Sequence, residues 1–148
     1  MLRYQLYECN DDKISIEKEI SYLKDYVDLQ KLRRGPEDEI ELVCSETVKG
    51  FSIEPLLLIP FVENSFKHLS HYSVGKKNQV KIAANRLNSE FIFSVENTIE
   101  SAAKKSAVGG IGLKNVQRRL ELLYPGKHRL QLPQGDEAFK IELRLKLN

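Results

Sequence analysis

The sequence has few of the residues that build metal centres and disulfide frameworks, and it lacks a long apolar run. It contains two cysteines, Cys9 and Cys44, and three histidines, with no CxxC pair. Two thiols so far apart are interpreted as reduced cysteines without a metal or redox role, and dispersed histidines disfavour a zinc site. No run approaches the roughly 18 apolar residues of a membrane span, and no signal peptide is found. We therefore expect a soluble, cytoplasmic chain.

A strong excess of one charge is also missing. The 23 Lys and Arg residues face 21 Asp and Glu residues, which gives a net charge of +2, and the two signs are interleaved. Nucleic-acid-binding surfaces usually show a dense basic block, so no nucleic-acid partner is expected. The 148 residues suffice for one domain with a sizeable core.

The spacing of apolar residues predicts a long first helix over residues 15–34. Ser15 is the expected N-cap, acidic residues in the first turn suit the helix dipole, and Gly35 followed by Pro36 is a typical stop. The apolar stripe is narrow and consists of Ile16, Ile20, Leu23, Val27 and Gln30. Packing against the core is the favoured role of this stripe, and pairing with a partner helix is the alternative.

Alternation of apolar and polar residues predicts the strands. Residues 39–44 form the first of them, and residues 80–84 and 91–95, joined by 85–89, read as an antiparallel hairpin. A second hairpin is predicted from residues 130–132 and 139–147, with its turn at 133–136. Strand pairs with short connections favour antiparallel pairing within a sheet.

A last helix is predicted between the two hairpins, ending at Pro125 and marked by Leu113, Val116, Leu120 and Leu123. Residues 71–78 are expected to be a loop, and residues 98–109, rich in small and basic side chains, a mobile loop. This order of elements predicts an α/β two-layer sandwich, with a mixed, mostly antiparallel sheet and helices packed on one face.

Residues 55–68 predict a helix with two different faces. One arc is apolar and holds Ile59, Val62, Phe66 and Leu69, and the opposite arc holds Glu63, Asn64, Lys67 and His68. Glu and Asn oxygens suit magnesium, and Lys and His can donate to phosphate oxygens. A solvated face with a Glu63–Lys67 ion pair is the alternative, and Pro60 marks either the first turn or a kink.

Two further stretches could contact a nucleotide. Gly110, Ile111 and Gly112 stand where the expected mobile loop meets a helix, so backbone amides there can approach phosphate closely. A plain turn is the alternative, because the stretch matches no generic nucleotide motif. Asn97 ends a strand and could bond a base edge, or it could simply favour the turn.

Together these segments resemble a known superfamily. PLLLIPFVENSFKH (55–68) looks like the N box of the histidine kinase, gyrase and chaperone-type ATPases, and GGIGLKNVQRRLELLYPG (109–126) looks like their glycine box. With YLKDYVDLQKLR (22–33) ahead of them, the combination is similar to the LytS/YehU-type sensor histidine kinases. The resemblance covers nearly the whole chain.

The resemblance implies a Bergerat-type fold that binds ATP and Mg²⁺ between the helix at 55–68 and a lid at about 98–109. Asn64 would hold the metal, Glu63 would polarise or position the nucleophile, and Lys67 and His68 would contact phosphates. The remaining nucleotide contacts would come from Asn97 at the adenine position and, on the phosphate side of the lid, from Gly110, Gly112 and Leu113.

Three departures from the family pattern stand out. Asn97 and Thr98 occupy positions where the family usually has Asp and Gly, and Ala138 stands where a Thr commonly precedes the last strand. The phosphoacceptor histidine should lie N-terminal to this sequence, since only residues 2–8 resemble the end of its helix. We therefore assign residues 1–12 to the tail of a dimerisation helix and a linker, and residues 13–148 to the catalytic domain.

The resemblance implies the ATP-binding domain of a sensor histidine kinase that phosphorylates a histidine outside this sequence. The expected partners are its own dimerisation domain, in a homodimeric full-length protein, and a response regulator. That protein would be anchored in the inner membrane with this domain in the cytoplasm. The alternatives are a non-catalytic interaction module with the same fold and a protein serine kinase of the same superfamily.

Overall fold

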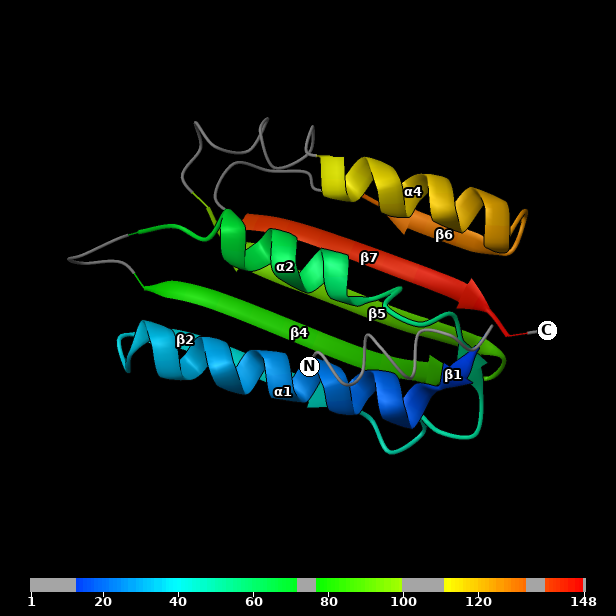
Figure 1. Cartoon of the computed structure of the whole chain (residues 1–148), viewed down its shortest axis with the longest axis horizontal. Helices are drawn as coiled ribbons and strands as arrows, with labels where there is room; N and C mark the ends of the chain where they lie inside the picture. Colours follow the sequence, from blue (N-terminus) through cyan, green and yellow to red (C-terminus); the bar gives the residue numbers. More distant parts are fainter. Residues whose placement is uncertain (1–12, 72–76, 100–110, 133–137, 148) are drawn as a thin grey trace.

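The computed structural model describes residues 13–71, 77–99, 111–132 and 138–147, and they form two layers (Figure 1). One layer is a five-stranded sheet in the order β2-β4-β5-β7-β6. Strands β2 and β4 pair in parallel, and the other three pairs are antiparallel. The predicted mixed, mostly antiparallel sheet is thus confirmed. The strands are β2 (Asp38–Cys44), β4 (Asn78–Leu87), β5 (Glu90–Thr98), β6 (His128–Gln131) and β7 (Ala138–Lys146).

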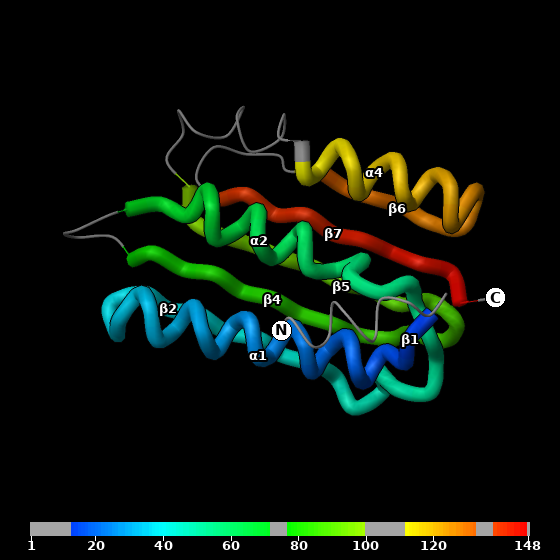
Figure 2. The backbone as a smooth tube through the Cα atoms, viewed as in Figure 1, coloured from blue at the N-terminus to red at the C-terminus, as the bar shows by residue number. Residues whose placement is uncertain are grey.

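The second layer consists of helices that cover one face of the sheet (Figures 1 and 2). They are α1 (Ile16–Arg34), α2 (Ile59–Lys67) and α4 (Ile111–Leu123). A short antiparallel pair, β1 (Ile14–Ser15) with β3 (Ser52–Ile53), lies beside the start of α1. No helix among the described residues is long and apolar enough to cross a membrane. The two-layer sandwich with helices on one face is confirmed.

Helix α1 has the predicted ends. The Ser15 side chain accepts a hydrogen bond from the Lys18 N–H at 3.3 Å, and the Gly35 N–H donates to the Lys31 carbonyl at 3.3 Å with a φ of 86°. Glycine adopts this left-handed conformation without the strain that a Cβ would cause. All five residues of the predicted stripe are buried, so the favoured core-packing role is confirmed.

The two hairpins are also present. Strands β4 and β5 are longer than predicted, and only Asn88 and Ser89 remain between them, with Asn88 at a φ of 58°. Asn tolerates this conformation better than other residues with a Cβ, so the turn can be this tight. Strand β7 buries Phe139, Ile141, Leu143 and Leu145 in strict alternation and pairs with β6. The predicted turn at 133–136 lies outside the described residues.

Helix α2 is shorter than predicted, and the expected start at residue 55 is wrong. Residues 55–58 form a turn and bend, in which Leu56 has a φ of 58°. A residue in the left-handed region cannot continue a right-handed helix, so α2 begins at Ile59. Pro60 then lies in the first turn, where its missing N–H costs nothing. The alternative of a kink at Pro60 is excluded.

The remaining predicted boundaries are partly described. Asn78 belongs to β4, and residues 72–76 of the predicted loop lie outside the described residues. Thr98 ends β5 and Ile99 is buried, whereas residues 100–109 of the predicted mobile loop also lie outside them. In α4, Leu123 is 41% exposed, and Tyr124, just past the helix, is buried instead. Residues 1–12 are likewise not described.

Candidate functional site

Helix α2 presents the predicted polar arc. Glu63 and Lys67 are exposed, Asn64 and His68 are half-buried, and the apolar arc on the other side is buried in the core. Among the ion pairs of the described residues, none joins Glu63 to Lys67. The ion pair proposed for a solvated helix face is therefore absent, and both charges remain available to a ligand.

Two amides near this arc have buried atoms without a partner. Asn64 Nδ2 makes no hydrogen bond among the described residues. Asn97 is 1% exposed, and its Nδ2 donates to the Thr98 carbonyl at 3.1 Å, whereas its Oδ1 has no partner. An unpaired buried polar atom costs about 1–3 kcal/mol, so such atoms are expected where a ligand completes the hydrogen bonding.

Side-chain hydrogen bonds bring the end of α2 and the end of β5 together. Ser70, just after α2, donates its N–H to the Thr98 carbonyl at 2.9 Å, and its Oγ lies 2.7 Å from Thr98 Oγ1. The Ser70 hydroxyl also donates to Asn78 Oδ1 at 2.6 Å, and Asn78 Nδ2 donates to Asp38 Oδ1 at 3.1 Å. This network joins the segment just after α2 to Thr98, the residue that follows Asn97 on β5.

The charges around the arc are set by partial burial. Burial, and then the neighbouring Lys67, lower the pKa of His68, so its imidazole is neutral at pH 7. Burial, and then the charge of Glu63, raise the pKa of Tyr26 on α1. The Tyr26 ring packs edge-on against Phe66 with centroids 5.9 Å apart. The carboxylate of Glu63 therefore lies within electrostatic reach of α1.

The predicted glycine contacts are only partly described. Gly112 is exposed in the first turn of α4, and no described atom lies within 4 Å of where its Cβ would be. This leaves room for close approach to its backbone. The Leu113 side chain is 1% exposed and belongs to the core, so only its backbone can face a ligand. Gly110 lies outside the described residues.

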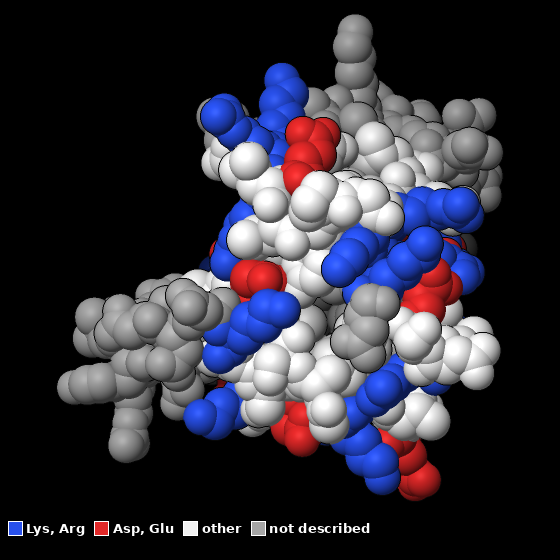
Figure 3. Space-filling view, turned by 90° about the vertical axis from the view of Figure 1, so that its right-hand side faces the viewer, with Lys and Arg blue, Asp and Glu red and all other residues white. Residues whose placement is uncertain are grey.

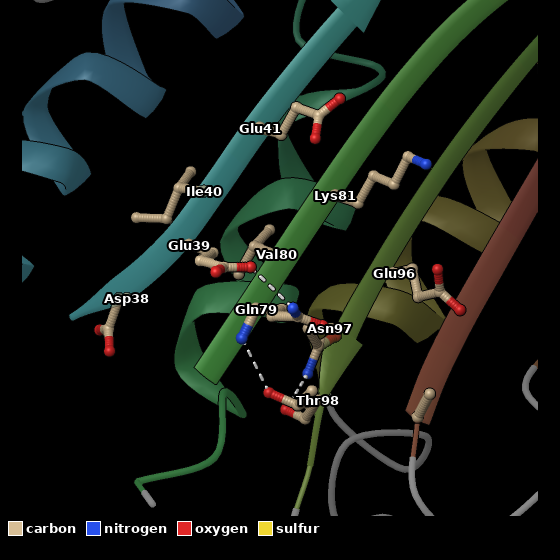
Figure 4. Close-up of a pocket in the computed structure, with 11 residues that line it drawn as sticks. Asp38, Glu39, Ile40, Glu41, Gln79, Val80, Lys81, Glu96, Asn97 and Thr98 are labelled. Carbon is tan, nitrogen blue, oxygen red and sulfur yellow. Dashed lines mark hydrogen bonds between the residues drawn. The ribbon is translucent and has the colours of Figure 1, made fainter. Parts of the chain in front are cut away.

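A hollow of about 770 Å³ lies beside Asn97 and Thr98 on the other face of the sheet (Figure 4). Paired residues on four adjacent strands form a row of alternating charges, Glu41, Lys81, Glu96 and Lys140, and the first three of them line the hollow. Glu39 accepts hydrogen bonds from Lys77 and Gln79, which lower the pKa of its carboxyl. This face carries mixed, neighbouring charges, and it is separated by the sheet from the polar arc of α2.

Another hollow, of about 460 Å³, lies at the opposite end of the sheet from Thr98. Basic side chains gather at this end of the molecule (Figure 3), and Lys13, Arg86, Lys127 and Lys146 line the hollow. Arg86 already donates to the Lys49 and Asn88 carbonyls and lies 5.2 Å from the centroid of the Phe51 ring. This cation holds its neighbouring loops, far from the arc on α2.

Sequence reasoning missed several residues that build the site. Ser70, Asn78 and Thr98 have no pattern of their own, because their bonds join residues distant in the sequence. Glu19 was assigned to the first turn of α1 as a dipole partner, yet it is fully buried. A signal was present, since Glu19 lies three residues after Ile16 and four before Leu23, on the buried side of the helix.

Comparisons with known proteins point to one class. A family model for histidine kinases matches residues 1–38. The sensor histidine kinase YpdA of Escherichia coli is 32% identical over 152 aligned positions, which cover 95% of this chain and 26% of YpdA. The sensor protein kinase HptS of Staphylococcus aureus is 31% identical over 68 residues, covering 46% of this chain and 13% of HptS. The chain spans about a quarter or less of the length of these relatives.

Solved structures share the fold. The nucleotide-free catalytic domain of histidine kinase ThkA matches with a TM-score of 0.63 at 12% identity, over 90% of this chain and 94% of that domain. The histidine kinase AdeS of Acinetobacter baumannii matches with a TM-score of 0.60 at 15% identity, over 92% of this chain and 68% of that one. The arrangement of strands and helices is therefore that of histidine kinase catalytic domains.

Proposed function

We propose that the chain belongs with the sensor histidine kinases, to which it is similar in sequence and fold, and that it is the ATP-binding catalytic domain of such a kinase. Its reaction is transfer of the γ-phosphoryl group of ATP to a histidine outside this chain. One observation carries the proposal. Asn64 Nδ2, which is buried and has no partner among the described residues, lies on the same arc of α2 as Glu63 and Lys67, and strand β5, which packs against α2, carries the unpaired Oδ1 of Asn97.

The residues present fit ATP and magnesium. The Asn64 amide offers an oxygen to Mg²⁺ and, in Nδ2, an unused donor for a phosphate oxygen. Lys67 and His68 donate to phosphates, and Gly110 and Gly112 let backbone amides approach them. Bound magnesium supplies charge neutralisation at the phosphates. Glu63 positions the attacking nucleophile, since phosphoryl transfer depends on placement more than on covalent chemistry.

Asn97 reads the base in this proposal. Its Nδ2 is held by the Thr98 carbonyl, which leaves Oδ1 as an acceptor with no partner. The exocyclic amine of adenine is a donor and suits this acceptor, whereas guanine has a carbonyl oxygen at the same position. A neutral amide thus replaces the Asp usual in the family and still favours ATP over GTP.

The larger protein is proposed to follow the family pattern. Residues 1–12 are the tail of a dimerisation helix and a linker, and residues 13–148 are the catalytic domain. The full-length protein is a membrane-anchored homodimer of the LytS/YehU type with this domain in the cytoplasm. It passes phosphate from its own histidine to a response regulator, and it binds no nucleic acid.

Calorimetric titration of the purified chain with a non-hydrolysable ATP analogue tests the proposal. Binding should strengthen when magnesium is added, and the matching GTP analogue should bind more weakly. If no ATP analogue binds with or without magnesium, the chain has the fold without a working nucleotide site, and the interaction-module alternative takes its place.

Incubation with γ-labelled ATP tests the location of the phosphoacceptor. None of His68, His71 and His128 matches the phosphoacceptor position, so the isolated chain should hydrolyse ATP slowly at most and retain no label. Acid-labile label that stays on this chain would contradict the assignment of the acceptor to another segment.

A further inference from the structure

The backbone of Leu56, just before α2, is held by charged side chains from two other helices. Its N–H donates to Glu19 Oε1 of α1 at 3.1 Å. Its carbonyl accepts from Arg119 Nη1 of α4 at 3.2 Å. Leu56 has a φ of 58°, a conformation that a residue with a Cβ adopts only when its surroundings enforce it.

Each of these two side chains also makes a second bond within the same short segment. The Leu58 N–H donates to Glu19 Oε2 at 3.1 Å, and Arg119 Nη2 donates to the Pro55 carbonyl at 2.7 Å. Glu19 is fully buried, and both of its carboxylate oxygens are used. Bonds from charged groups to buried backbone are the stronger class of hydrogen bond.

These bonds act directly on the start of α2. Leu58 is the N-cap residue of α2, and no side chain of its own segment caps the helix. Glu19 therefore provides from α1 a carboxylate where a helix N-terminus favours negative charge. Arg119 lies in α4, the helix that begins at the glycine motif, so the two helices of the proposed nucleotide site meet at this one segment.

Helix α1 also holds the other end of α2. Arg34 Nη2 donates to the Phe66 carbonyl at 2.9 Å, and the guanidinium lies 5.3 Å from the centroid of the Phe66 ring. Glu19 and Arg34 stand near opposite ends of α1. A displacement of α1 is therefore transmitted to both ends of the helix that carries Glu63 and Asn64.

We propose that Glu19 and Arg119 are positioning residues, which set the placement of the polar arc of α2 relative to α1 and α4 through the Leu56 peptide. The inference rests on the proposed nucleotide site. Movement of α1 then changes nucleotide binding without any contact between α1 and the nucleotide. Such coupling needs a physical connection between the two helices, and the four bonds at residues 55–58 provide it.

Two conservative variants test this role in the full 148-residue chain. Glu19→Gln keeps the size but has one acceptor oxygen in place of two, and Arg119→Lys keeps the charge but loses the two-pronged geometry. Glu17→Gln and Arg118→Lys are the matched controls. They make the same two substitutions on the same two helices, at residues whose side chains are exposed. Affinity for a non-hydrolysable ATP analogue with magnesium is measured at a temperature well below the thermal unfolding midpoint of every variant.

Each test variant should bind the analogue roughly tenfold more weakly than the wild type, whereas each control should match it. The double variant Glu19→Gln with Arg119→Lys should lose less than the product of the two single losses, because both act on one peptide. A lowered unfolding midpoint with unchanged affinity in the folded range would reduce both residues to structural support and overturn the proposal.

Amide chemical shifts of the nucleotide-free chain separate this inference from the proposed function. Glu63, Asn64 and Lys67 should shift in the two test variants and stay in place in the controls. If the wild-type chain binds no nucleotide, the proposed function fails, and these shifts still decide whether Glu19 and Arg119 position α2. Unchanged shifts along α2 would refute the positioning role by itself.

Discussion

Glu19 and Asn97 are both polar and almost completely buried, yet their surroundings treat them differently. Glu19 is 0% exposed, and both of its oxygens accept backbone N–H groups before α2. Asn97 is 1% exposed, and its Oδ1 accepts nothing among the described residues. The complete set of hydrogen bonds around Glu19 stabilises a backbone conformation, whereas the unpaired oxygen of Asn97 is an acceptor for the ligand that we propose. Burial alone therefore does not separate structural from functional polar residues.

Glu54 stands between these two cases. It is 8% exposed and Oε2 has no partner among the described residues, while its carboxylate lies against Tyr124. Burial, and then this carboxylate, raise the pKa of the Tyr124 hydroxyl, which therefore stays protonated at neutral pH. Because the Tyr124 hydroxyl interacts with this carboxylate, the unpaired Oε2 of Glu54 marks a ligand site less clearly than Asn97 Oδ1 does.

Removing the Glu19 carboxylate should give the largest loss of stability. Glu19→Ala leaves the N–H groups of Leu56 and Leu58 without acceptors, and we expect a loss of about 2–4 kcal/mol in the free energy of unfolding. Urea unfolding followed by circular dichroism measures it. The exposed Glu17→Ala is the control and should change the free energy by less than about 0.5 kcal/mol. A loss equal to that of the control would mean that the Leu56 turn does not depend on Glu19.

Substituting the amides with unpaired atoms, Asn64 and Asn97, should weaken nucleotide binding and leave the free energy of unfolding nearly unchanged. Asn64→Ala removes the proposed magnesium ligand, and we expect affinity for the ATP analogue with magnesium to fall roughly 10- to 100-fold. Binding without magnesium should change much less. Calorimetry checks both, with the exposed Asn115→Ala on α4 as an amide control. Equal affinity in wild type and variant would remove Asn64 from the site.

Asn97→Ala should have a smaller effect on binding, because one neutral hydrogen bond is lost. We expect roughly three- to tenfold weaker binding of the ATP analogue, with unfolding free energy within about 1 kcal/mol of wild type. The preference for ATP over GTP should shrink with it. Ser94→Ala on the same strand is the control. A large loss of stability with unchanged nucleotide affinity would show that Asn97, like Glu19, has a structural role.

The smallest expected effect is a pH dependence from His68. Its pKa lies below the usual value of about 6.5, so the folded chain resists protonation there and its unfolding free energy should fall as pH drops below that value. Phosphates favour the protonated imidazole, so nucleotide affinity should rise over the same interval. Calorimetric titration with the ATP analogue from pH 8 to pH 6 measures the pH dependence of the affinity. The His68→Asn variant should show a weaker pH dependence of the affinity. A wild-type profile as flat as that of the variant would remove His68 from phosphate contact.

Much of the fold follows from local patterns in the sequence. The caps at Ser15 and Gly35 fixed the ends of α1 because capping depends on residues within one turn. Alternation identified β7, since a strand buried on one face exposes every second residue. The polar arc of α2 was found because helix geometry places residues three and four apart on one side. The sequence identified the residues on this arc, and their roles in binding and catalysis are predictions.

The parts that the sequence did not reveal depend on distant residues. Leucine gives no hint of a left-handed backbone, and Leu56 adopts one because Glu19 and Arg119 hold its peptide. The parallel pairing of β2 with β4 and the two-residue strands β1 and β3 leave no periodic trace. The orphaned Oδ1 of Asn97 appears only when the neighbouring strands are in place.

The parallel pairing of β2 with β4 also affects the order in which the domain folds. Strands β4 and β5 are joined by two residues and can pair early, whereas Asp38 and Asn78, at the start of the β2–β4 pair, are 40 residues apart. Contacts between distant residues form slowly because a long loop must close first. Helix α2 lies inside that loop, so the proposed nucleotide site is expected to assemble in the last stage of folding. If the chain binds ATP as proposed, binding reports that the whole domain has folded.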